Sequence, residues 1–317
     1  MEMRALSRQT PVWLFAAFLL TAAGCGSSLY EYQFEPDTDN SYEYSLSQDM
    51  NIEMGFFGME MEMGQKARQK ARVQFTKEED GLTSAAYTFT EAEIEPTIKS
   101  SLPIPDDMIN TVKEIYKAMI GQQFTVVLDE RGQAVELKGI KEMMMEMIRS
   151  MDMPEEALGA IDPLIESSLG DQPISEMMSQ MFPLMPKGEL DVGAEWESNL
   201  SLQGFALDIQ CVLTKREDGM AHVAVEGNLS PGESHQMNLP GLGSLETEYK
   251  ELEGSYKGVY IIDEATGLAV DYAIDMTMNA VLQAKIGEVE GAPAPPTPPI
   301  NIKISAKTTA SLAEQAP

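Results

Sequence analysis

Apolar and polar residues alternate strictly from residue 42 onwards. Between residues 42 and 54 the even positions are mainly apolar and the odd positions are glutamate, serine, aspartate or asparagine. After the GFFG tetrapeptide at residues 55–58 the odd positions become apolar, beginning with Met59, Met61 and Met63. Because successive side chains of a strand point to opposite faces, this pattern predicts a β-hairpin whose methionines share one face.

The same period of two recurs along most of the chain. Further strands are expected near residues 29–34, 84–95, 124–128, 134–137, 196–202, 205–213, 221–225, 249–262, 270–282 and 300–306. Turn residues separate them at 217–219 and 263–267, as hairpins require. Long antiparallel strands with one apolar face predict a curved sheet or an unclosed half-barrel of about ten to twelve strands.

The middle of the chain changes to a helical period. Apolar residues recur at helical spacing over residues 108–119, 140–151 and 174–182, and more weakly over 155–169. A helix with one apolar stripe must bury it, and the apolar face of the sheet is the natural partner. The expected fold is therefore α+β, mainly antiparallel β, with three or four amphipathic helices packed on the concave face.

The first 25 residues read as an export signal. Arg4 and Arg8 precede an apolar run that ends at Ala22-Ala23-Gly24-Cys25. This ending resembles the lipobox of bacterial lipoproteins, which implies lipidation of Cys25; the alternative is an ordinary signal peptide that contains a cysteine. In that family Gly26 implies the outer membrane of a Gram-negative bacterium, with the lipid as membrane anchor.

One domain is expected after the signal. Residues 1–24 form the signal peptide, 25–28 the lipidated cysteine and a short tether, and 29–317 a single β-rich domain. That domain carries a helical insertion at about 106–186 and a proline-rich loop at 287–299. Cys211 is expected in the core, and Trp196 is expected to act as a packing anchor.

Charge and motifs narrow the function. The formal net charge of −29 argues against nucleic acid and against anionic lipid headgroups as partners. His222 and His235 are the two histidines, and neither lies in the spacing of a zinc site or a catalytic triad. No cofactor motif is present, so a non-enzymatic protein without cofactor or metal is expected. A hydrolase with an unrecognised site, with His222 as the residue of interest, is the remaining enzymatic alternative.

Methionine is the unusual residue, at 23 of 317 positions, clustered at 50–63, 143–153 and 177–185. Copper(I) binding is disfavoured because no histidine or cysteine lies near these clusters. Two interpretations of the methionine clusters remain: the side chains fill the core, or they line a deformable apolar cavity. Methionine is suited to both roles. The cavity predicts binding of a lipid or another hydrophobic ligand. Its expected lining is Met59, Met61, Met63, Met144, Met147, Met177, Met178, Met181, Phe182, Met276 and Met278.

The alternative function is a structural or assembly lipoprotein that binds envelope proteins. The polar face of the second hairpin strand carries the basic residues Lys66, Arg68, Lys70 and Arg72. These residues are a candidate surface for binding a partner protein. The alternative is that they form an ordinary charged strand edge, which discourages pairing with other sheets and would have the same sequence pattern.

Four stretches carry a family resemblance. They are LYEYQFEPDTDNSYEYSLSQDMNIEM, MPKGELDVGAEWE and YIIDEATGLAVDYAIDM, together with the terminal INIKISAKTTASL. The chain resembles an uncharacterised family of bacterial envelope lipoproteins of unknown function, which implies one domain and assigns no site. Its element order is similar to that of the LolA and LolB lipoprotein carriers and related lipid binders. This resemblance implies an unclosed barrel of about eleven antiparallel strands with helices on its concave side, and it does not transfer their activity, since none of their motifs is present.

Overall fold

The structure is a computed structural model, and it describes residues 30–56, 59–101, 106–149, 185–186, 188–202, 205–232, 235–239, 243–286 and 299–315. The strands are β1 (Tyr30–Glu31), β2 (Ser41–Phe56), β3 (Met59–Lys77), β4 (Thr83–Ser100), β5 (Gln123–Leu128), β6 (Ala134–Lys138), β7 (Glu189–Leu190), β8 (Glu195–Leu202), β9 (Phe205–Glu217), β10 (Met220–Pro231), β11 (His235–Leu239), β12 (Gly243–Asp263), β13 (Ala269–Ile286) and β14 (Ile300–Gln315). The helices are α1 (Asp106–Ala118) and α2 (Ile140–Arg149).

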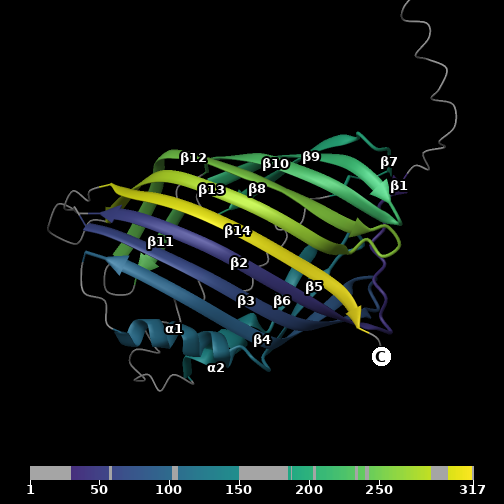
Figure 1. Cartoon of the computed structure of the whole chain (residues 1–317), viewed down its shortest axis with the longest axis horizontal. Coiled ribbons are helices and arrows are strands. Elements are labelled where there is room, and N and C mark those ends of the chain that lie inside the picture. The colour runs from purple at the N-terminus through teal and green to yellow at the C-terminus, as the bar shows by residue number, and fades with distance from the viewer. Residues whose placement is uncertain are drawn as a thin grey trace, which may run out of the picture.

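One antiparallel sheet organises nearly all of these elements. Its strand order is β6-β5-β4-β3-β2-β14-β13-β12-β10-β9-β8, and β11 pairs separately with β12. The two halves of the chain are joined where β2 pairs with β14, from Ser41 opposite Gln315 to Gly55 opposite Asn301. Figure 1 shows the sheet curving so that its first and last strands lie behind the central ones.

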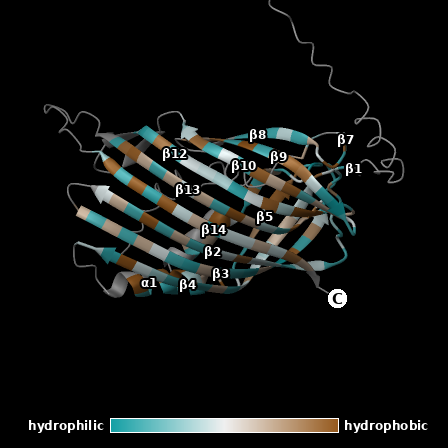
Figure 2. Cartoon of the chain, turned by 45° about the horizontal axis from the view of Figure 1, so that its top comes forward, coloured by the Kyte–Doolittle hydropathy of each residue, from teal (hydrophilic) through white to brown (hydrophobic). Residues whose placement is uncertain are grey.

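Alternation along the strands sets the two faces of the sheet. The predicted hairpin of β2 and β3 is confirmed, and Met54 lies directly opposite Met61 on one face. Figure 2 shows the same banding of apolar and polar residues across the strands. We call the face that carries Met54 and the core residues the concave face, and the other the convex face.

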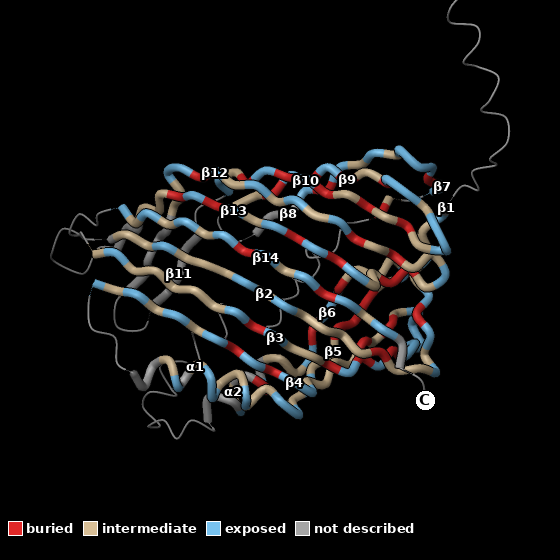
Figure 3. The backbone as a smooth tube through the Cα atoms, in the orientation of Figure 1, coloured by how far each residue is buried: buried red, intermediate tan, exposed pale blue. Residues whose placement is uncertain are grey.

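The sheet buries its concave face largely against itself. Val126 of β5 and Leu268, beside the start of β13, belong to one buried cluster with Phe75, although many strands separate β5 from β13 in the sheet. Rolling a sheet in this way removes apolar surface from water without another layer. Buried positions are densest at the end of the sheet near β5 and β6 (Figure 3).

The expected α+β fold with helices over the concave face is wrong. The described residues are almost entirely antiparallel strand, and the two helices among them lie at one side of the sheet, where α1 packs against β4 and α2 against β5. The sequence argument assumed that the apolar face needs a helical partner, whereas the rolled sheet supplies much of that partner itself. The other two helices were predicted at 155–169 and 174–182, outside the described residues. Neither α1 nor α2 is long and apolar enough to cross a membrane.

The N-terminal segment closes one end of the rolled sheet, which we call the closed end. Strand β1 pairs with β7, with Tyr30 opposite Leu190. The hydroxyl of Tyr32 then donates to the carbonyl oxygens of Arg131 and Gly267, at 3.2 and 3.1 Å. These contacts join the β5–β6 turn to the β12–β13 turn. The opposite end, where β2 ends and β3 begins, we call the groove end.

An ion pair also holds the closed end, and its loss is expected to destabilise the fold. Arg216 Nε and Nη2 donate to the two carboxylate oxygens of Glu264 at 2.6 and 2.9 Å, and both side chains are 18% exposed. Glu264→Gln is expected to cost about 2 kcal/mol of unfolding free energy, because it leaves a largely buried guanidinium without its charge partner.

Urea denaturation measures this cost. The matched control is Glu226→Gln, because Glu226 lies 3.9 Å from Lys257 and both side chains are more than 70% exposed. We expect the control to cost less than about 0.5 kcal/mol. Equal losses in the two variants would contradict a structural role for the Arg216–Glu264 pair.

Candidate functional site

A groove of about 1120 Å³ lies at the groove end. A row of directly opposed concave-face residues runs across it, one from each of five adjacent strands. We call this the groove row: Leu252, Ala280, Ile302, Met54 and Met61. Ile302, Met54 and Met61 are only half-buried, so apolar surface stays accessible here. Accessible apolar surface in a groove is typical of a ligand site. Charged residues, among them Glu60 and Lys250, also line this groove.

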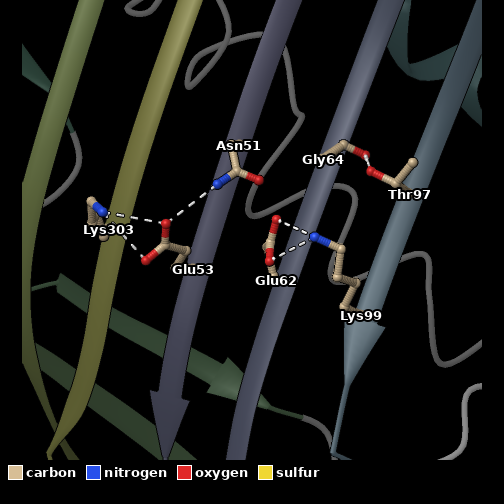
Figure 4. Close-up of polar contacts among 7 residues, drawn as sticks. All are labelled: Asn51, Glu53, Glu62, Gly64, Thr97, Lys99 and Lys303. Carbon is tan, nitrogen blue, oxygen red and sulfur yellow. Dashed lines mark hydrogen bonds and ion pairs between the residues drawn. The ribbon is translucent and has the colours of Figure 1, made fainter.

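Charged residues next to the groove row pair with one another on the convex face. Lys303 Nζ lies 3.3 Å from Glu53 Oε1, and Lys99 Nζ lies 3.0 Å from Glu62 Oε1. Figure 4 shows these two pairs bridging β14 to β2 and β3 to β4. Opposite charges across adjacent strands neutralise each other and hold the register at the groove end.

A polar pair lies in the middle of the concave face, between β2 and β3. Gln65 Nε2 donates to Gln48 Oε1 at 3.2 Å, and both side chains belong to the concave face of the predicted hairpin. Tyr256 lies in the same cross-strand row as Gln65, with Met276, Ala306 and Met50 between them. Most of this row is therefore apolar, and the glutamines form a local polar contact within it.

A smaller cavity of about 90 Å³ lies at the closed end. Tyrosines dominate its walls, and their hydroxyls pair: Tyr44 with Tyr272 at 3.0 Å, beside Tyr256 with Tyr260 at 2.7 Å. Val126, Leu128 and Leu312 are among its apolar lining residues, and Arg131 and Gln133 also line it. The hydroxyl pairs satisfy groups that would be costly to bury alone.

Burial perturbs the titration of these groups. It raises the pKa of Tyr87 and of Tyr256 to about 12, because the ionised phenolate would be poorly solvated. The same cause raises the pKa of Tyr44 and Tyr260 further, with the neighbouring tyrosine of each pair adding to the shift. Such groups stay neutral at physiological pH and act as hydrogen-bonding, not ionising, walls.

Cys211 is fully buried on β9, as expected for a core residue. Burial raises the pKa of its thiol to about 12. A thiol that stays protonated and covered is unreactive, so it takes no part in chemistry here.

The predicted methionines fall into separate places. Met61 lies in the groove row, and Met63 follows on the same face of β3. Met276 and Met278 lie on the concave face of β13, closer to its middle, and Met278 is buried. Met59 begins β3 beside the groove end. Of the remaining residues, Met144 and Met147 belong to α2, which packs against β5, and Met177, Met178, Met181 and Phe182 lie outside the described residues.

The predicted basic surface lies on the convex face of β3, between acidic neighbours. Lys70 Nζ is 2.9 Å from Glu91 Oε1, and Lys66 Nζ is 3.8 Å from Asp49 Oδ2. The two arginines also face acids across the strands: Arg68 is opposite Glu93 and Arg72 opposite Glu43. The four basic residues thus form part of an alternating charge lattice. Their role as a partner surface stays a prediction.

Sequence reasoning missed Met54 as a groove residue, and it also missed Leu252, Ala280 and Ile302. Each lies in a strand whose alternation was recognised, so its face could be assigned. What was missing was the register between distant strands, which places these residues level with Met54. Among the described residues, no group of three or more histidine, cysteine, aspartate or glutamate side chains could hold a metal ion.

Comparison with known proteins identifies a family to which no activity has been assigned. The family described as "Family of unknown function (DUF6263)" matches residues 83–269, from the start of β4 to the start of β13. No curated protein matches the chain. The likeness to lipoproteins and to LolA and LolB stays a prediction.

Solved structures resemble the chain only distantly. A structure of lipovitellin described by its lipid–protein interactions is 10% identical, with a TM-score of 0.48, and covers 89% of this chain. This chain spans about a quarter of that one, 26% of its length. OccK7 (OpdD) of Pseudomonas aeruginosa is 8% identical with a TM-score of 0.23, covering 87% of this chain and all of its own. The translocator domain of the autotransporter NalP from Neisseria meningitidis is 8% identical with a TM-score of 0.21, covering 86% and 88%. Scores this low carry no information on ligand or location.

Proposed function

Since the chain belongs to the DUF6263 family, which assigns no activity, we propose from the groove itself that the protein is a non-enzymatic binder of a hydrocarbon chain. The observation that carries this proposal is the groove row, a continuous line of apolar side chains across five strands, of which Ile302, Met54 and Met61 stay partly accessible. Exposure of these apolar side chains to water is unfavourable in free energy. A bound hydrocarbon chain would cover them and remove this penalty.

The dimensions support a lipid acyl chain as the ligand. Five adjacent strands are separated by four interstrand spacings, so the groove row extends over roughly 19 Å. One leaflet of a bilayer has a hydrocarbon thickness of roughly 15 Å, which is the length of a typical extended acyl chain. The groove row can therefore accept most of one chain.

The side chains of the row suit a ligand of variable shape. Met54 and Met61 are unbranched and flexible, and they lie opposite each other near the end of the hairpin where β2 ends and β3 begins. Methionine adapts to irregular apolar partners better than branched residues do. Binding of several related chains, rather than one rigid molecule, follows from this composition.

We also propose that the protein is exported and anchored through lipidated Cys25. Tyr30 is held at the closed end by its pairing with Leu190. Tyr30 is five positions after Cys25, which allows at most roughly 17 Å between them. An anchored molecule would keep its closed end near the membrane and point the groove end away from it.

A charge in the groove row is expected to abolish binding. Ile302→Glu, in the full chain carrying Cys25→Ser, should weaken binding of the hydrocarbon probe diphenylhexatriene by at least about tenfold, because a carboxylate on the groove floor would lose its hydration when the probe binds. Probe fluorescence gives the dissociation constant, and circular dichroism confirms that the variant is folded.

Two further variants make this test decisive. Met54→Glu places the charge on the neighbouring strand and should give the same loss. Ser305→Glu, on the exposed convex face of the strand that carries Ile302, should leave binding unchanged. Native mass spectrometry followed by organic extraction identifies a co-purifying lipid. A ligand-free mass together with no probe uptake would contradict the proposed function.

A further inference from the structure

The cavity at the closed end is lined by side chains from distant parts of the chain. Tyr44 comes from β2, Tyr87 from β4 and Tyr272 from β13, while Phe34 lies in the N-terminal segment and Arg131 in the turn between β5 and β6. The rings of Tyr44 and Tyr87 meet edge to face, with their centroids 6.0 Å apart. The rolled sheet therefore brings three phenol groups and a guanidinium to one small space.

The guanidinium of Arg131 has no carboxylate partner among the described residues. Its Nη2 donates to the carbonyl oxygen of Met185 at 2.5 Å, which uses only one of its N–H groups. The carboxylate of Asp129 instead accepts from the backbone N–H groups of Arg131 and Gln133, at 2.8 and 2.9 Å, and so shapes the turn. Arg131 is half-buried against the cavity. A partly desolvated positive charge without a counter-charge favours a bound anion.

The tyrosine hydroxyls add further donors to the same cavity. Tyr44 and Tyr272 pair at 3.0 Å, and because each hydroxyl carries a single proton, one proton of the pair has no acceptor in the described part of the chain. The hydroxyl of Tyr87 has no hydrogen-bond partner among the described residues. Burial, and second the charge that Tyr272 would carry, raises the pKa of Tyr87 to about 12, so these hydroxyls share one poorly solvated space. The complement of such a set of donors is an acceptor.

The volume of the cavity limits the ligand to a small molecule. The cavity measures about 90 Å³. An apolar cavity of about 150 Å³ accepts benzene, so at the same ratio the closed-end cavity accepts roughly four or five non-hydrogen atoms. Leu128, Ile262 and Leu268 provide apolar walls. A monocarboxylate of roughly two or three carbons combines this size with an acceptor at one end and an apolar body.

We propose that the closed-end cavity is a second ligand site, which binds a short-chain monocarboxylate. Arg131 pairs with the carboxylate, and Tyr87 and the Tyr44–Tyr272 pair donate to its oxygens. A carboxylate leaves water only where it is both paired and hydrogen-bonded, and these groups supply both. The site is independent of the groove, because Tyr44 and Met54 are ten positions apart on β2, roughly 33 Å. It therefore does not rest on the proposed hydrocarbon binding.

The test compares two probes of the same shape that differ in charge. Propionate carries a carboxylate, and propionamide places an uncharged amide in the same position. In ligand-observed NMR titrations of the full chain carrying Cys25→Ser, propionate should bind at least about tenfold more tightly, since only the carboxylate forms charge-assisted hydrogen bonds with arginine. Arg131→Gln should remove this preference. Lys257→Gln, which removes the same charge from the exposed convex face of β12, should retain it.

A second variant separates binding from folding. Tyr87→Phe should raise the dissociation constant of propionate by about tenfold, because it removes a donor to a charged oxygen. The thermal midpoint of the ligand-free variant should stay the same or rise, because the hydroxyl it removes has no partner among the described residues. Tyr116→Phe is the matched control, since Tyr116 lies on α1 and is not part of the cavity lining. It should leave the dissociation constant unchanged.

The outcomes are distinguishable. Equal binding of propionate and propionamide, or a preference that persists in Arg131→Gln, would overturn recognition of the carboxylate by Arg131. Equal effects of Tyr87→Phe and Tyr116→Phe would overturn the placement of the ligand in this cavity. Failure of the unsubstituted protein to take up propionate at millimolar concentration would overturn the site as a whole. Binding of diphenylhexatriene, which is too large for this cavity, reports on the groove and tests the proposed function separately.

Discussion

Gly258→Ala is expected to lower the free energy of unfolding by about 3 kcal/mol, near the upper end for overpacking a tight site. Gly258 lies on the concave face of β12, between Val225 of β10 and Ile274 of β13. A Cβ at this position would lie far inside van der Waals contact with the carbonyl oxygen of Ala273 and with Cδ1 of Ile274. The backbone oxygen cannot move aside without breaking the ladder between β12 and β13.

Chemical denaturation measures this loss, and Gly55→Ala is the matched control. Gly55 is also a strand glycine, but the nearest atoms to an added Cβ, on Asn301, are 3.9 Å away. Alanine there should be neutral or slightly stabilising, because it removes freedom from the unfolded chain. If Gly258→Ala were as stable as Gly55→Ala, the close approach of β12 to β13 would not be a requirement of the fold.

Raising the pH from 10 towards 12 is expected to unfold the protein. Tyrosine has an ordinary pKa of 10.0, and burial raises the folded-state pKa of Tyr87 and Tyr256 to about 12. A group whose pKa is higher in the folded state contributes its full stability below the unfolded pKa and loses it as the pH rises through the folded value. Tyr44 and Tyr260 shift in the same direction, so several kcal/mol of stability should disappear in this range.

Ultraviolet absorbance of tyrosinate follows this transition directly. The buried tyrosines should ionise late and together, at the pH where circular dichroism reports loss of strand. In concentrated urea all tyrosines should ionise near pH 10, which provides the unfolded reference. Complete ionisation near pH 10 in a protein that keeps its strand signal would show that the tyrosine hydroxyls are accessible to water in the folded state.

Local pattern was sufficient to predict the strands and their faces. The alternation in residues 42–54 and 59–75 placed Met54 and Met61 on one face, and the register of β2 and β3 agrees. Helix positions 108–119 and 140–151 also correspond to α1 and α2. These features depend on the period of neighbouring side chains, which a sequence displays directly.

The alternation of apolar and polar residues could not predict that the sheet rolls. It depends on close approach at concave-face glycines such as Gly254, where an added Cβ would lie 2.6 Å from the oxygen of Thr277. A glycine in an alternating run reads as a weak strand position, and nothing local shows that the strand bends there. Helices were therefore assigned to a face that the sheet covers largely by itself.

The candidate site was predictable only in part, for the same reason. Met61 was identified from its cluster, whereas Ile302 required the pairing of β14 with β2. Arg131 was not singled out, because a sequence gives a side chain's type and position but not its ion-pair partners. That no described carboxylate pairs with its guanidinium emerges only when the surroundings are known.

The pairing of β2 with β14 has a consequence for how the chain folds. Residues 41–55 cannot complete their hydrogen bonds until residues 301–315 have been synthesised. Contacts between such distant segments raise the contact order, and proteins rich in them fold slowly. Until β14 docks, β2 exposes an open ladder edge, which is the kind of edge that recruits other chains. Newly made molecules therefore pass through a period in which aggregation competes with closure of the sheet, and a holding chaperone would shorten their exposure to it.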